Sequence, residues 1–317
     1  MSGTSLRRPA RSIPILGSLR RTARLTWVEI LKLLWAKLFP TTIIITLIAT
    51  AGLALAGKYI TQGVSSSVRF SNYSLWVASS SLGLRVGMVL LVAIGAAALS
   101  SEATGRTLNT MLTRPMRRLE FVAAKILALV FATVVVVAAA ALAAYIVGGT
   151  VQPRWNTRRT IVSSIGQETV EEPPRSFPSY GDVVDPTFPD TVIATQAEVM
   201  GSMLYGFLLL VVPVLAGVSL GFMLGTVLNS SGLAIGLSVG LFVSLEGSKF
   251  FSMFEENIGR YTYNYPINRI YTLMGEAGKG GVPVWDDAVR GVGVAAIYVA
   301  VCLLVSVVVF CRRDVTL

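Results

Sequence analysis

The chain has 317 residues, of which 53% are hydrophobic and only 14% are charged, and its formal net charge is +10. An ordinary soluble domain carries about 25% charged residues, so this composition excludes most soluble folds and predicts a membrane protein. The chain contains no histidine, which excludes Ser-His or Cys-His catalysis, imidazole proton relays and His-ligated metals.

The N-terminal region divides into an arm and an amphipathic helix. Residues 1–18 contain prolines and scattered arginines, and we expect a flexible cytoplasmic arm. Over residues 19–38, apolar residues recur every three or four positions, and most basic residues lie off that stripe. Such a helix suits the membrane interface, where the rings of Trp27 and Trp35 would lie at headgroup level. A cytoplasmic helix packed on another domain is the alternative.

Six apolar segments follow, and each is long enough to cross about 30 Å of hydrocarbon, which takes about 20 residues. They cover residues 39–57, 82–100, 122–148, 203–228, 231–250 and 291–311. The sequence therefore predicts an all-α polytopic membrane protein, with residues 39–317 forming one transmembrane domain.

Positive charge gathers on one side of this predicted topology. With a cytoplasmic N-terminus, the cytoplasmic segments hold 15 of the 27 Lys and Arg residues but only four of the 17 acids. The positive-inside rule then places both termini in the cytoplasm. Because the excess cations follow the membrane topology, we expect no nucleic-acid partner.

The most informative segment is the charged hairpin 101–121, which joins the second and third spans. Glu102 opens it, Gly105 permits a turn, and Pro115 follows a short apolar face. A helix with an apolar face and a charged rim would fit a groove on a soluble cytoplasmic partner. Each arginine taken alone is better explained as a positive-inside anchor, and only the arrangement as a whole favours a partner.

A long outer loop, residues 149–202, is rich in proline and acidic residues. Loops of this length inside a compact domain are either functional or without structure of their own. Two interpretations stay open, namely a solvated loop and a docking surface for an extracytoplasmic protein.

The fourth and fifth spans carry small residues at every fourth position. These are Gly217, Gly221, Gly225, Gly232, Gly236 and Gly240. Small residues at this spacing let helix backbones approach closely in lipid. The pattern predicts packing faces, within the bundle or at a dimer seam.

Two further features lie near the outer end of the fifth span. Glu246 and Lys249 are three residues apart, so they either pair inside the membrane or mark its interface. Residues 251–290 are aromatic and too polar for two more spans. We expect outer-face interfacial or re-entrant helices there, buried against protein.

The hairpin resembles the signature of type-2 ABC exporter permeases, the transmembrane subunits of ATP-binding cassette transporters. The matching positions are Glu102, Gly105, Thr107, Leu108, Leu112, Pro115, Arg117 or Arg118, and Lys125. The segment Phe310–Asp314 is similar to the Arg-Arg-Asp ending of the same permeases. The helix 19–38 matches their elbow helix, and six spans with both termini inside match their topology.

The resemblance implies a type-2 ABC exporter fold and a permease that is not itself an enzyme. It implies a second permease copy, with a homodimer expected, and two separate cytoplasmic ATPase subunits that hold ATP and magnesium. The chain itself would bind no cofactor or metal. The implied coupling residues are Glu102, Gly105, Arg106, Thr107, Leu108, Leu112, Pro115, Arg117 and Arg118.

The implied activity is export, or transmission of force outward, across a prokaryotic cell membrane. Loop 149–202 is longer than in simple members of that family, so the resemblance does not extend to the cargo. A non-transporting membrane scaffold, which holds an extracytoplasmic partner through this loop, is the alternative function.

Overall fold

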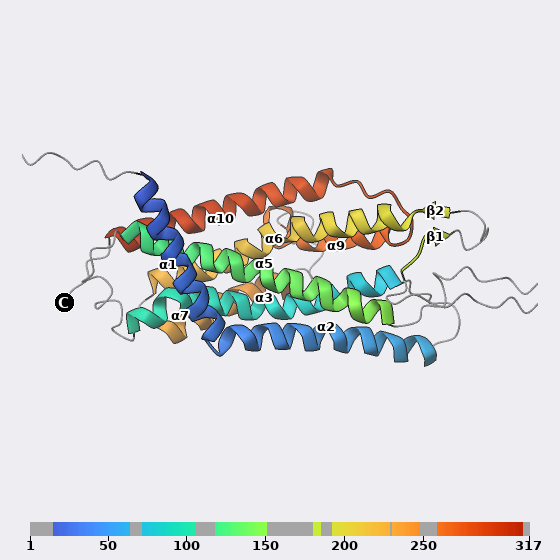
Figure 1. Cartoon of the computed structure of the whole chain (residues 1–317), viewed down its shortest axis with the longest axis horizontal. Helices are drawn as coiled ribbons and strands as arrows, with labels where there is room; N and C mark the ends of the chain where they lie inside the picture. Colours follow the sequence, from blue (N-terminus) through green and yellow to red (C-terminus); the bar gives the residue numbers. More distant parts are fainter. Residues whose placement is uncertain are drawn as a thin grey trace, which may run out of the picture.

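The computed structural model describes residues 15–63, 72–104, 118–150, 180–184, 192–228, 230–247 and 259–312. Helices that run side by side form most of it (Figure 1). The helices are α1 (Ile15–Trp35), α2 (Leu38–Gly63), α3 (Asn72–Thr104), α5 (Arg118–Thr150), α6 (Gln196–Val227), α7 (Ser231–Gly247), α9 (Tyr265–Ala277) and α10 (Asp286–Arg312). Strands β1 (Val183–Val184) and β2 (Val192–Ala194) pair antiparallel, and Gly259–Tyr261 forms one 3₁₀ turn.

Five of the described helices, α2, α3, α5, α6 and α10, are long and apolar enough to cross a membrane. This confirms the expectation of an all-α polytopic membrane protein. Helix α7 occupies the predicted fifth span but has only 17 residues. At 1.5 Å per residue it is about 25 Å long, which is short of the roughly 30 Å of hydrocarbon. The count of six spans therefore stays a prediction.

Helices α3 and α6 begin earlier than hydropathy predicts, at Asn72 rather than 82 and at Gln196 rather than 203. Thr195 caps α6, and its backbone N–H donates to the Glu198 carboxylate at 2.9 Å, which completes a capping box. Helix α3 has 33 residues and α6 has 32, or about 50 Å each, which exceeds the 40–45 Å of a whole bilayer. Both helices are therefore longer than the hydrocarbon core requires.

Helix α3 lies at the centre of the bundle, where it contacts α2, α5, α6, α7 and α9. Glycines set how closely its neighbours approach. A Cβ on Gly221 would collide with the backbone carbonyl of Val92, and one on Gly225 would collide with that of Ala96. Only glycine permits this contact between α6 and α3, as expected for helices that associate in lipid.

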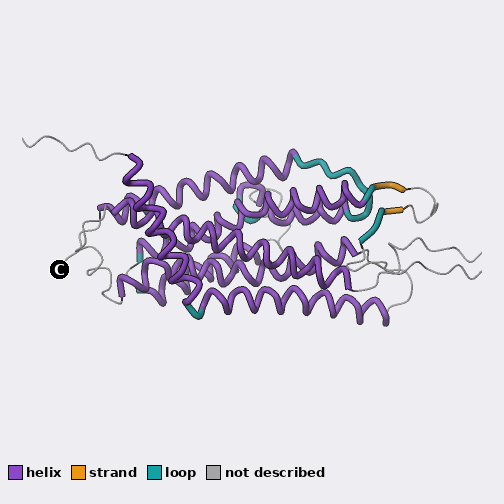
Figure 2. The backbone as a smooth tube through the Cα atoms, in the orientation of Figure 1, coloured by secondary structure: helices purple, strands orange, loops and turns teal. Residues whose placement is uncertain are grey.

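The two ends of the bundle differ. At one end, which we call the hairpin end, α3 finishes and α5 begins; α1 and the end of α10 lie at this same end (Figure 1). Helix α1 runs across the bundle there rather than along it. Strands β1 and β2 lie at the opposite end, called the strand end (Figure 2). Both termini of the described chain thus lie at the hairpin end.

Candidate functional site

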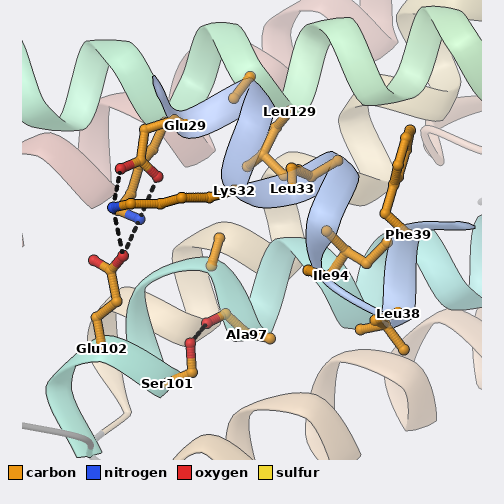
Figure 3. Close-up of a pocket in the computed structure, with 14 residues that line it drawn as sticks. Glu29, Lys32, Leu33, Leu38, Phe39, Ile94, Ala97, Ser101, Glu102 and Leu129 are labelled. Carbon is orange, nitrogen blue, oxygen red and sulfur yellow. Dashed lines mark hydrogen bonds and ion pairs between the residues drawn. The ribbon is translucent and has the colours of Figure 1, made fainter. Parts of the chain in front are cut away.

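Four charged side chains from three helices meet at the hairpin end (Figure 3). We call Glu29 and Lys32 of α1, Glu102 of α3 and Lys125 of α5 the charge cluster. The Lys125 ammonium lies 3.0 Å from Glu29 Oε2 and 2.9 Å from Glu102 Oε1. The Lys32 ammonium lies 2.7 Å from Glu29 Oε1 and 3.8 Å from Glu102 Oε1. Two cations and two anions therefore neutralise one another.

Helix geometry brings these groups together. Glu29 and Lys32 are three residues apart, so they share one face of α1. Lys125 lies near the start of α5, and Glu102 lies in the last turn of α3. The Lys125 side chain is only 4% exposed. Since a buried ammonium is costly unless it is paired, the cluster fixes the relative positions of α1, α3 and α5.

The cluster also determines the ionisation of Glu29. Burial alone would raise the pKa of this carboxyl, but the ammonium groups of Lys125 and Lys32 outweigh that effect and hold the pKa below its ordinary value. Glu29 is therefore ionised at neutral pH, as its two ion pairs require.

A cavity of about 200 Å³ adjoins the cluster. Apart from the cluster, its lining consists of Leu33 and Ala36 of α1, Leu38 and Phe39 of α2, Ile94, Ala97, Ala98 and Ser101 of α3, and Ala128 and Leu129 of α5. This lining is almost wholly apolar (Figure 3). Among the described residues, no group of His, Cys, Asp or Glu side chains could hold a metal ion.

Aromatic contacts join the last helix to the cluster. Lys125 Nζ lies 5.0 Å from the ring centroid of Phe121, which is a cation–π distance. Phe121 stacks in turn on Phe310 near the end of α10, with centroids 6.0 Å apart. The hairpin end of α5 is thus tied to α1, α3 and α10 together.

Of the predicted coupling residues, the structure places only Glu102 in the cluster. Gly105, Arg106, Thr107, Leu108, Leu112, Pro115 and Arg117 lie outside the described residues. Arg118 is the first residue of α5. The described helices on both sides of the hairpin, however, contribute directly to the cluster, through Glu102 before it and Lys125 after it.

The other predicted residues fall into two groups. Trp27 and Trp35 of α1 lie on the outside of the chain, 61% and 85% exposed. Gly217, Gly221 and Gly225 are buried and pack toward α3, and Gly217 also faces Tyr263. Nothing lies within 4 Å of the position that a Cβ would take on Gly232, Gly236 or Gly240. Only the first glycine series therefore packs inside the described chain.

Two charged features lie outside the sequence prediction. The roles of Glu29 and Lys32 depend on the packing of α1 on α5. The sequence does offer one signal for Glu29, because it is the only acidic residue before Glu102. The sequence pairs Glu246 with Lys249, which lies outside the described residues. The ion-pair partner of Glu246 in the structure is Arg85 of α3, at 3.7 Å. Arg85 interrupts an apolar segment, and that interruption is the signal in the sequence.

A family model described as "Protein of unknown function (DUF2705)" matches residues 42–316. The chain belongs to this family. The DUF2705 match includes Glu102 and Lys125 but begins after α1, so Glu29 and Lys32 lie outside the matched residues. No curated protein sequence matches the chain.

Proposed function

We propose that this chain is the permease subunit of an ATP-binding cassette exporter, driven by two separate cytoplasmic ATPase subunits and paired with a second permease copy. The hairpin end is its cytoplasmic end. The observation that carries the proposal is the charge cluster, because it locks both flanks of the hairpin to the crosswise helix α1. The hairpin's resemblance to the coupling segment of type-2 exporter permeases supplies the identity of the partner.

The cluster gives the hairpin a mechanical role. Glu102 and Lys125 pair at 2.9 Å, so the end of α3 and the start of α5, between which the hairpin lies in the sequence, are held together. A partner that displaces the hairpin must move α3 and α5 together. Helix α3 is the central helix and runs about 50 Å toward the strand end. Movement at the hairpin would therefore reach the outer face through one rigid element.

Helix α1 supports the same orientation. The face with Trp27 and Trp35 is exposed, whereas the face with Glu29 and Leu33 packs on the bundle. An outward apolar face with tryptophans suits a helix that lies in the headgroup layer of a cell membrane. With α1 at the cytoplasmic interface, the positive-inside bias and the position of the hairpin agree.

Charge reversal in the hairpin tests this function. Arg117→Glu combined with Arg118→Glu should lower substrate-stimulated or basal ATP hydrolysis of the assembled complex about tenfold or more, because a coupling contact with an acidic rim would become repulsive. The matched control is Lys279→Glu with Arg290→Glu, which reverses two exposed cations away from the hairpin end (Figure 1). The proposal fails if both variants assemble and turn over ATP like the wild type.

One observation favours the alternative of a membrane scaffold. The segment after the long loop is firmly anchored at the strand end, because the Tyr180 ring stacks on Tyr145 at 4.8 Å and its hydroxyl donates to the Tyr145 carbonyl at 2.9 Å. Deletion of residues 155–178 would leave this anchor in place. If that deletion abolishes function while the hairpin charge reversals do not, the scaffold replaces the permease as the preferred function.

A further inference from the structure

A second polar cluster lies inside the bundle, where α3, α7 and α9 meet. Arg85 of α3 donates from Nη2 to Asn268 Oδ1 at 2.6 Å and lies 3.7 Å from Glu246 Oε2 of α7. Asn264, 1% exposed, donates from Nδ2 to Glu246 Oε1 at 3.3 Å. Arg85 precedes Glu102 by 17 positions, or about 25 Å along the helix, so this cluster is separate from the hairpin end.

Hydrogen-bond donors of the second cluster lack acceptors among the described residues. A guanidinium has five N–H donors, and the described residues provide Arg85 with one hydrogen bond, to Asn268. Its Nε is buried without a hydrogen-bond partner among them, as are the hydroxyls of Tyr263 and Tyr271. These tyrosines are only 1% and 6% exposed. Tyr271 lies beside Ser80 and near Arg85, and Tyr263 lies near Glu246.

Such donors are costly at this depth. A charged side chain inside a membrane is retained when it pairs or lines a polar site, and each unpaired buried donor loses its hydration without a replacement partner. The Arg85 side chain is nonetheless 41% exposed. The guanidinium therefore has an unused donor and is itself partly accessible.

We propose that the second cluster binds an anionic oxygen group, a carboxylate or a phosphate, on a ligand that enters the membrane domain. The planar fork of Arg85 matches the paired oxygens of these groups. Glu246 offsets the charge of the empty site and orients Asn264, and the Tyr271 hydroxyl supplies a further donor. A cationic ligand would instead meet a surplus of donors. The binding does not rest on the proposed permease function; if that function holds, the ligand is the cargo.

The test uses the full-length purified chain in dodecyl maltoside and measures binding by isothermal titration calorimetry. Dodecyl phosphate represents a lipid headgroup, inorganic phosphate represents a free anion, and dodecyltrimethylammonium is the cationic control. We expect the anionic probe to bind and the cationic probe not to bind. Binding of dodecyl phosphate alone identifies a headgroup site, and equal binding of inorganic phosphate identifies a site for the free ion.

Three substitutions make the test specific. Arg85→Gln should weaken binding about 10- to 100-fold, and Arg85→Lys less, because it keeps the charge but loses the fork. Tyr271→Phe removes one hydroxyl, with little risk to folding, and should weaken binding about 2- to 10-fold. Arg269→Gln is the matched control, because Arg269 is similarly exposed at 37% and its Nε likewise lacks a hydrogen bond among the described residues, but it lies 3.4 Å from Asp287 rather than beside Glu246.

Unchanged binding in Arg85→Gln and Tyr271→Phe, or equal binding of the cationic probe, would overturn the proposal. The experiment contains no ATPase subunit. A failure here therefore concerns the second cluster alone and leaves the proposed coupling function to its own test.

Discussion

Replacement of Lys125 by methionine should destabilise the membrane domain strongly. The ammonium lies at 3.0 and 2.9 Å from two carboxylates whose side chains are 11% and 18% exposed. At an effective dielectric constant of about 20, each pair attracts by about 5 kcal/mol before desolvation is subtracted. Removal of one partner of a buried ion pair typically costs about 3–5 kcal/mol. Lys32 stays close to both carboxylates, so we expect a loss of about 3 kcal/mol.

The assay is equilibrium unfolding in mixed dodecyl maltoside and SDS micelles, followed by circular dichroism. Lys37→Met is the matched control, because Lys37 lies just after α1 and is exposed, and it should change the free energy of unfolding by less than about 0.5 kcal/mol. Adding Glu102→Gln to Lys125→Met should recover about 1 kcal/mol or more, because one uncompensated carboxylate disappears. A loss below about 1 kcal/mol in Lys125→Met, or strict additivity in the double variant, would refute the buried charge cluster.

Three further predictions follow from particular contacts. Gly225→Ala should cost about 1–3 kcal/mol in the same unfolding assay, because its Cβ would displace the Ala96 backbone, whereas Gly236→Ala, with open space, should be neutral or slightly stabilising. Folding lowers the pKa of Glu29. Its contribution to the free energy of unfolding is therefore complete above the ordinary pKa of 4.5 and is lost as the pH falls through the lowered value. Glu29→Gln should flatten the acid limb of a stability–pH curve, and an unaltered limb would contradict the ion pairing of Glu29. Tyr180→Ala should raise amide hydrogen exchange at residues 180–184 about tenfold or more, because the ring stack on Tyr145 is lost; unchanged exchange would show that the stack does not hold this segment.

The sequence predicts the helical membrane architecture well, because apolar segments of membrane-spanning length are rare in soluble proteins. Helix boundaries are predicted less accurately where polar or aromatic residues continue a helix beyond the hydrocarbon. The capping box of Thr195 and Glu198 starts α6 early, and packing of Trp76 on Phe207, at 5.6 Å between ring centroids, stabilises the first turns of α3. Hydropathy averages do not register such local stabilisation.

The sequence likewise predicts only some residues of the candidate site. The hairpin pattern and its flank single out Glu102 and Lys125, and these residues lie 2.9 Å apart in the structure. Glu29 stands out in the sequence only as the single acid before Glu102, and its role and that of Lys32 depend on how α1 packs on α5, which is a tertiary contact. The partnership of Arg85 with Glu246 is likewise a contact between helices, and it joins residues 161 positions apart along the chain. A sequence pattern favours near neighbours such as Lys249 instead.

The proposed function requires that a separate ATPase drive this chain through the hairpin. Purification of the chain from native membranes in a mild detergent, with identification of co-purifying proteins and an ATP hydrolysis assay, tests this. We expect a stoichiometric soluble partner with P-loop motifs, whose ATPase activity copurifies with the wild type and falls with the Arg117→Glu and Arg118→Glu reversal. Recovery of an extracytoplasmic protein as the main companion, with no ATPase and no hydrolysis, would contradict it.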